Sequence, residues 1–175
     1  AMSGHSKWSQ IKRKKGVADG KRSQLFSRLS KNISVEARLA GGDKTSPSLR
    51  AAIEKAREAN MPNENIDRAI SKANETKSLE KIVYEAYGPG GVGLIIEALT
   101  DNKNRSAQEI KFALSKNGTS LAGIGAVTWA FKRENNEWLA ETTVPVGEGI
   151  SADLEKLIDD LEELEDVSEV FTNAE

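Results

Sequence analysis

The 175-residue sequence contains no cysteine and a single histidine, His5. Without cysteine there is no disulfide scaffold, no thiolate nucleophile and no thiolate metal site. One histidine, in a basic stretch with no partner to orient it as a base, also excludes the commoner nucleophile–base pairs and most zinc sites. We therefore expect no catalytic residue, no metal, no cofactor and no small-molecule substrate, and we interpret the protein as a non-enzyme.

Long apolar runs are missing as well. The longest, residues 92–96, is far shorter than the roughly 20 residues that span a bilayer. The N-terminal residues are charged and lack the apolar segment of a secretory signal. With 38% hydrophobic and 30% charged residues, the composition is typical of a soluble globular protein. These features predict a cytoplasmic protein without a membrane partner.

Acidic residues are scarce at the start of the chain. Residues 1–40 contain ten Lys and Arg against Asp19 and Glu36, a net charge of +8, whereas residues 41–80 sum to zero and residues 81–175 to −10. The positive charge is densest in residues 1–22, which we call the basic arm. Its cations and its aromatic residue are Lys7, Trp8, Lys12, Arg13, Lys14, Lys15, Lys21 and Arg22.

A cationic segment of this density attracts polyanions, and an aromatic ring inside it offers a surface on which a base can stack. The alternative is a solvated tail without a partner. We predict that the arm contacts nucleic-acid phosphates and that Trp8 stacks on a base or anchors the arm.

Apolar residues recur at helical spacing in three segments of the first 80 residues. The first covers residues 23–40, and its opposite face carries Arg28, Lys31 and Arg38, which would extend the basic surface of the arm. The second begins at residues 46–47 and ends before residue 61, and the third begins at Asn63. We expect residues 1–80 to form a domain of a basic arm and a three-helix bundle.

From residue 81 the spacing changes to that of strands. Strand patterns cover residues 81–87, 92–99, 126–132, 137–146 and 167–172. Helical patterns cover residues 101–117 and a segment that begins at Ser151. In residues 126–132 the strand period places Val127, Trp129 and Phe131 on one face. The order β-β-α-β-β-α-β predicts an acidic α/β domain over residues 81–175, one mixed sheet covered by two helices, so the fold class is α+β.

Two further polar features have competing interpretations. Lys103 and Arg105 lie at the start of the helix at 101–117, where free N–H groups and added positive charge could form a secondary anion site; the alternative is a helix cap with solvated charges. The glycine-rich run of residues 88–93 lacks the spacing of a phosphate-binding loop and joins two strands, so we interpret it as a turn.

Several multi-residue motifs resemble the YebC family. In the first half they are GHSKW at residues 4–8, Ile11-Lys12, Lys15, NMP at 60–62, Asn65-Ile66 and RAI at 68–70. In the second half they are YGPGGV at residues 87–92, LTDN at 99–102, Asn104-Arg105, and a C-terminal segment that includes VFTN at 170–173. One departure is visible: typical members carry a further α/β domain where this chain has only residues 132–141.

The resemblance implies a regulator of gene expression. Members are described as DNA-binding transcriptional regulators, and others are similar to the mitochondrial translational activator of cytochrome oxidase or act on the ribosome. The sequence offers no helix-turn-helix with recognisable base-reading side chains. We therefore predict a nucleic-acid-binding regulator, with DNA as the first expected partner and ribosomal RNA as the alternative. A third interpretation is a protein–protein adaptor that works through the acidic α/β domain.

Overall fold

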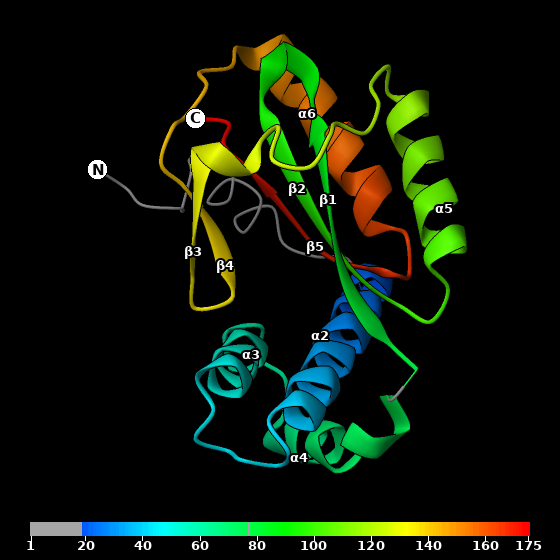
Figure 1. Cartoon of the computed structure of the whole chain (residues 1–175), viewed down its shortest axis with the longest axis vertical. Helices are drawn as coiled ribbons and strands as arrows, with labels where there is room; N and C mark the ends of the chain where they lie inside the picture. The colour runs from blue at the N-terminus through cyan, green and yellow to red at the C-terminus, as the bar shows by residue number, and fades with distance from the viewer. Residues whose placement is uncertain (1–18, 77) are drawn as a thin grey trace. The chain divides into compact units, whose positions relative to one another are not determined.

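The structure is a computed structural model that describes the backbone of residues 19–76 and 78–175 and the side chains of residues 25–75 and 78–175 (Figure 1). The described chain divides into two compact units. We call them the helical unit, which ends at Glu80, and the α/β unit, which begins at Lys81. Each unit is described by itself.

The helical unit is built around the helix α2 (Asp19–Leu39), which contacts each of the other helices of the unit. These are α3 (Pro47–Glu58), α4 (Asn63–Ser71) and the short 3-10 helix η1 (Ala73–Thr76). The predicted helical segments are therefore confirmed. The core combines large residues such as Ile33 and Leu49 with small ones such as Ala52 and Ala56, and these small side chains let the helices approach closely.

The α/β unit follows the predicted order of elements, and the α+β class is confirmed. Its first half contains β1 (Glu80–Tyr87), η2 (Pro89–Gly91), β2 (Gly93–Thr100) and α5 (Lys103–Lys116). Its second half contains η3 (Thr128–Ala130), β3 (Phe131–Glu134), β4 (Glu137–Ala140), α6 (Glu148–Glu162) and β5 (Val167–Thr172). The glycine-rich run is the link between β1 and β2, as predicted.

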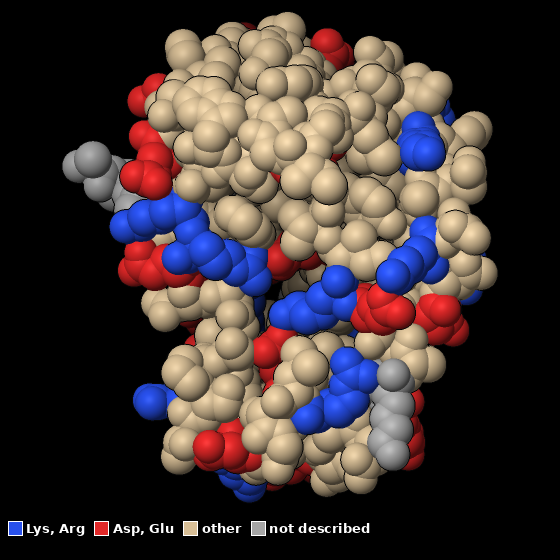
Figure 2. Space-filling view, viewed as in Figure 1, with Lys and Arg blue, Asp and Glu red and all other residues tan. Residues whose placement is uncertain are grey.

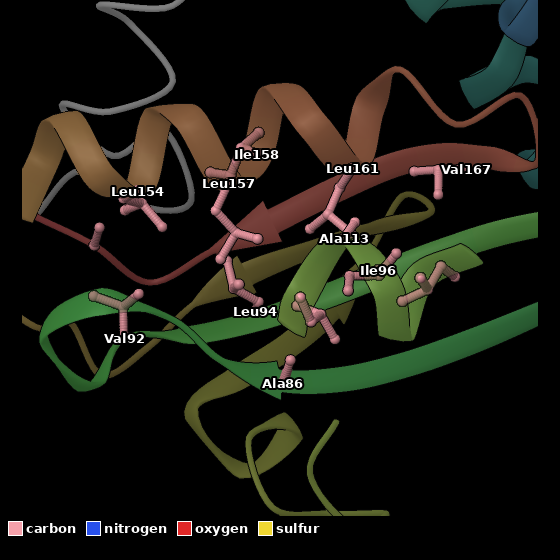
Figure 3. Packing of buried hydrophobic residues seen from close by; sticks show 13 residues of the cluster. Ala86, Val92, Leu94, Ile96, Ala113, Leu154, Leu157, Ile158, Leu161 and Val167 are labelled. Carbon is pink, nitrogen blue, oxygen red and sulfur yellow. The ribbon is translucent and has the colours of Figure 1, made fainter. Parts of the chain in front are cut away.

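The main core lies between the sheet and the helices α5 and α6. Side chains alternate between the two faces of β2, so Leu94 and Ile96 face this core together with Leu157 and Leu161 of α6 (Figure 3). Ile95 points to the other face, where it packs with Phe131 and partly buried Phe171. Both faces of the sheet are therefore covered.

Within the described residues the strands form two sheets, which corrects the expectation of one. The order β1-β2-β5 forms a three-stranded sheet, and β3 and β4 pair only with each other. Asn135 and Asn136 between them both have positive φ, at 51° and 64°, as a two-residue hairpin turn requires. Because this turn is so short, β4 pairs with β3, the strand directly before it. The hairpin packs against the main sheet through its side chains.

The strand predicted for residues 126–132 is also shorter than expected. Residues 128–130 form the turn η3, and β3 begins only at Phe131. Val127 and Phe131 are buried, whereas Trp129, which the strand period places on the same face, is 69% exposed. The backbone N–H groups of Val127 and Thr128 bind the carboxylate of Glu85, so they do not take part in a strand ladder.

Candidate nucleic-acid interface

Most of the basic arm lies outside the described residues. This applies to Lys7, Trp8, Lys12, Arg13, Lys14 and Lys15. Lys21 and Arg22 belong to the first turns of α2, where the backbone alone is described. The structure thus shows that the arm leads directly into a long helix that ends at Leu39.

The three cations predicted on α2 to extend the basic surface are half-buried. Arg28, Lys31 and Arg38 share a face of the helix with Val35, which is completely buried. The Arg38 guanidinium donates a hydrogen bond to the carbonyl oxygen of Leu79 (3.1 Å). Burial lowers the pKa of Arg28 from its ordinary value. Residues 33–37 of the same helix are all buried.

Arg105, one of the two cations of the possible secondary anion site, contacts two acids of the chain itself. Its guanidinium contacts Asp101 (2.8 Å) and Asp166 (3.1 Å), and hydrogen bonds to these two carboxylates raise the pKa of Arg105. The side chain of Asn102 accepts a hydrogen bond from the backbone N–H of Arg105 (3.1 Å) and so caps α5. These contacts fit the helix-cap interpretation, because Arg105, one of the two cations in the first turn of α5, already faces two acids.

Asp166 is a polar residue that the sequence pattern did not single out. It is only 7% exposed, and its carboxylate accepts hydrogen bonds from Ser106 Oγ (2.7 Å) and Arg105 Nε (3.2 Å). It thereby connects the first turn of α5 to the residue that precedes β5. No local signal identifies it, because Ser106 lies 60 positions away in the sequence.

Other cations of the described chain form ion pairs with neighbouring acids. Arg57 pairs with Glu54 at 3.0 Å, Arg68 with Glu64 at 3.2 Å, Lys132 with Glu134 at 3.1 Å and Lys156 with Asp160 at 3.3 Å. Figure 2 accordingly shows Lys and Arg interspersed with Asp and Glu on the face in view. A dense excess of positive charge is instead a property of residues 1–22, where seven Lys and Arg stand against Asp19 alone.

A second buried carboxylate, that of Glu85 in β1, organises the loop before β3. It accepts hydrogen bonds from the backbone N–H groups of Gly125 (2.7 Å), Val127 (2.9 Å) and Thr128 (2.9 Å). Burial alone would raise the pKa of Glu85, but these three donors outweigh it and lower the pKa. An acid in a strand has no distinguishing pattern, so the role of Glu85 is not visible in the sequence.

Two other kinds of feature are absent from the described residues. They contain no helix that is both long and apolar enough to cross a membrane. Among the same residues, no cluster of three or more His, Asp or Glu side chains is placed to hold a metal ion.

Comparison with protein-family models gives matches over most of the chain. The model described as "TACO1/YebC protein N-terminal domain" matches residues 6–76. The model described as "TACO1/YebC second and third domain" matches residues 79–136.

Two curated relatives carry the name "Probable transcriptional regulatory protein". The one from Pseudothermotoga lettingae is 56% identical over 137 residues, which cover 76% of this chain and 54% of the relative. The one from Anoxybacillus flavithermus is 46% identical over 180 residues, which cover 99% of this chain and 74% of the relative. The chain thus spans about half the length of the first relative and about three quarters of the second.

A solved structure has a similar fold. The crystal structure of the conserved hypothetical protein Aq1575 from Aquifex aeolicus superposes with a TM-score of 0.74 at 32% sequence identity. The superposition covers 90% of this chain and 91% of that chain.

Proposed function

The chain belongs to the TACO1/YebC family, and from this premise we propose that it is a non-enzymatic, DNA-binding regulator of gene expression that acts in the cytoplasm. The names of the relatives as transcriptional regulatory proteins support the proposal. The proposal rests mainly on the concentration of positive charge in residues 1–22.

The proposed contact surface is the basic arm. Cations bind nucleic acid mainly by displacing counterions from phosphates, which requires positive charge that the protein's own acids do not neutralise. Arg38 and Arg105 bind a carbonyl and two carboxylates of the chain itself, so we leave them out of the contact set. Lys7, Lys12, Arg13, Lys14, Lys15, Lys21 and Arg22 form it, with Trp8 among them.

The division of charge orients the protein. We propose that residues 1–80, the arm with its helical bundle, act as the nucleic-acid-binding domain and residues 81–175 as a second domain. The second domain has a net charge of −10, and like charges repel. It should therefore point away from a bound polyanion.

The exposed side chains of the helical unit fit contacts to the phosphate backbone better than contacts to bases. A helix that reads bases presents hydrogen-bonding side chains to the major groove. On α4, however, the exposed residues include Glu64 and Asp67 beside Arg68, and two acids on the same short helix oppose entry into a groove lined by phosphates. We therefore expect an affinity for DNA that depends strongly on salt concentration and weakly on the DNA sequence.

Salt dependence of DNA binding tests the proposal. If about five cations reach phosphates, log K falls with log salt at a slope of about −4 to −5 on duplex DNA. Replacing four arm cations with glutamine should make the slope shallower by about 3 to 4. The arm variant carries the changes Lys12→Gln, Arg13→Gln, Lys14→Gln and Lys15→Gln. Fluorescence anisotropy with a labelled duplex at several salt concentrations measures both slopes.

A control variant removes the same amount of charge elsewhere. It carries Arg57→Gln, Arg68→Gln, Lys132→Gln and Lys156→Gln. Each of these cations is paired with a neighbouring acid, so the control should retain the wild-type slope. Equal effects of the two variants, or a wild-type affinity independent of salt, would refute the role of the arm.

Ribosomal RNA is the second candidate partner, because contacts to phosphates do not by themselves distinguish RNA from DNA. Co-sedimentation with ribosomes, compared with binding to random duplex DNA at equal salt, separates the two functions. Retention on ribosomes at a salt concentration that releases the duplex would make translation the regulated process. The reverse order of affinities would support the DNA-binding regulator.

A further inference from the structure

Three large apolar side chains are exposed close together in the α/β unit. We call Tyr87, Ile124 and Trp129 the aromatic patch; their exposed fractions are 48%, 105% and 69%. Tyr87 ends β1, and the other two belong to the loop before β3, which pairs with β1 through a bridge between Ala86 and Leu121. In Figure 1 this loop crosses in front of β1 and β2.

The aromatic patch is held rigidly by hydrogen bonds. Tyr87 Oη (3.1 Å) and Trp129 Nε1 (2.8 Å) both donate to the carbonyl oxygen of Ala126, so the two rings converge on one atom. The loop backbone on either side of Ala126 is fixed by the buried carboxylate of Glu85. Because the polar atoms of both rings already have partners and the backbone is fixed, binding a partner here costs little conformational entropy.

The segment that carries Ile124 and Trp129 has no charged side chain of its own, and Glu85, whose carboxylate binds its backbone, is buried. Residues 117–131 contain no Lys, Arg, Asp or Glu. Figure 2 shows a broad uncharged face over the α/β unit in the view in which this loop lies in front. Depletion of charge together with exposed Tyr and Trp is the composition of the buried centre of a protein–protein interface.

We propose that the aromatic patch is a self-association surface that a second copy of this chain covers. In a symmetric dimer, residues near the two-fold axis meet their own copies, so a charge there would face a like charge. The α/β unit has a net charge of −10, and its copies repel each other except where the surface is neutral. The aromatic patch supplies such a neutral surface, and its contact with a second copy is apolar on both sides.

The charges argue against nucleic acid as the occupant. Protein–nucleic acid contacts are largely made to phosphates by Lys and Arg. Residues 117–131 offer no cation for that purpose, and the unit around them is acidic. The self-association surface is also independent of the proposed function, since it needs neither the basic arm nor a polynucleotide.

Sedimentation equilibrium of the full chain without nucleic acid tests the proposal. At concentrations up to the order of 100 μM, we expect a monomer–dimer equilibrium. The variant Ile124→Ser with Trp129→Ser should weaken dimerisation by about tenfold or more, because it removes two anchors from the centre of the contact. Both side chains are exposed, so the thermal midpoint of the variant should stay close to that of the wild type.

Phe112→Ser is the matched control. Phe112 is also 69% exposed, but it lies on α5 with the charged Lys116 over its ring, so its replacement should leave dimerisation unchanged. Added salt should strengthen the dimer by screening the repulsion between acidic units, whereas it weakens DNA binding. This opposite dependence distinguishes failure of the self-association surface from failure of the proposed function.

Three results would overturn the proposal. One is a wild-type chain that stays monomeric across the concentration range, and another is equal weakening by Phe112→Ser. The third is a monomer whose tryptophan fluorescence is quenched by single-stranded oligonucleotides only while Trp129 is present, which would make the aromatic patch a base-stacking site.

Discussion

Glu85 is a buried acid whose charge stabilises a loop instead of performing chemistry. Its three N–H donors come from residues 40 to 43 positions further along the chain. A carboxylate that accepts several backbone hydrogen bonds favours its charged form, and it fixes the conformation of the donors in return. Glu85 thereby determines both the turn η3 and the presentation of Trp129.

Glu85→Gln should destabilise the α/β unit in a pH-dependent way. The amide is a weaker acceptor, so we expect a loss of about 1.5–3 kcal/mol at neutral pH. Because the folded-state pKa of Glu85 lies below its unfolded value, the carboxylate contributes fully above the unfolded pKa, which is about 4.3. Its contribution disappears as pH falls through the folded-state pKa.

Urea unfolding of the wild type and the glutamine variant between neutral and acidic pH measures this effect. The difference between their free energies of unfolding should be largest near neutrality and shrink in acid. A difference that stays constant with pH would show that packing, and not the charge, is responsible.

The role of a single residue could be predicted only where it depends on residues nearby in the sequence. Period-two spacing predicts that Val127 and Phe131 share a face, and both are buried. Trp129 has the same spacing but is exposed, because Glu85 binds the loop backbone from a distant strand. The helix-start position of Arg105 leaves both anion binding and a helix cap open, and its contact with Asp166, 61 residues away, is not visible in the sequence. Such partners have no local pattern in the sequence.

At the scale of elements, the turn η2 and the helix α6 fit together through a glycine. Gly90 has a φ of 75°, and a Cβ added there would come within 2.8 Å of the Cγ2 atom of Ile150. Gly91 has a similar φ of 80°, but a Cβ added there would meet no atom within 4 Å. A side chain at Gly91 would therefore cause backbone strain alone, whereas a side chain at Gly90 would cause strain and steric overlap with α6.

Gly90→Ala should destabilise the protein more than Gly91→Ala. Both changes place a side chain at positive φ, which costs about 1–2 kcal/mol, and Gly90→Ala adds overlap with α6 that costs about a further 1–3 kcal/mol. Thermal or urea unfolding of the two variants measures the difference. Equal losses would show that α6 moves aside without cost.

The elements themselves were predictable, whereas the pairing of the strands was not. Each helix and strand has its own apolar period, so their order follows from the sequence. The separate β3–β4 hairpin depends on the Asn135–Asn136 turn and on Arg133, which contacts Glu97 of β2 at 2.7 Å. The sequence pattern of a hairpin does not indicate whether its strands pair with those of a neighbouring sheet. The prediction of one sheet was wrong for that reason.

At the scale of the whole molecule, each of the two units has buried residues of its own. Leu49 belongs to the core of the helical unit, and Leu157 belongs to that of the α/β unit. Both side chains are completely buried. A unit with its own core can open without the other, and we propose that the two units do so.

Leu49→Ala should therefore loosen the helical unit selectively. Removing a buried leucine side chain costs about 2–5 kcal/mol. Amide hydrogen exchange of the full chain, resolved by mass spectrometry, should show lost protection in residues 19–76 and retained protection in the α/β unit. Leu157→Ala is the reciprocal variant. Loss of protection throughout the chain in either variant would show that the units unfold together.

The strand order β1-β2-β5 also has a consequence for synthesis of the chain. β2 pairs with β5 along residues 94–98, yet β5 is translated after every other helix and strand described in the α/β unit. During elongation one edge of β2 is consequently unpaired, and part of the apolar surface around Leu94 and Ile96 is uncovered. The helical unit needs only nearby residues and can fold as soon as it emerges. The nascent chain thus passes through a stage in which a folded helical unit precedes an incomplete sheet.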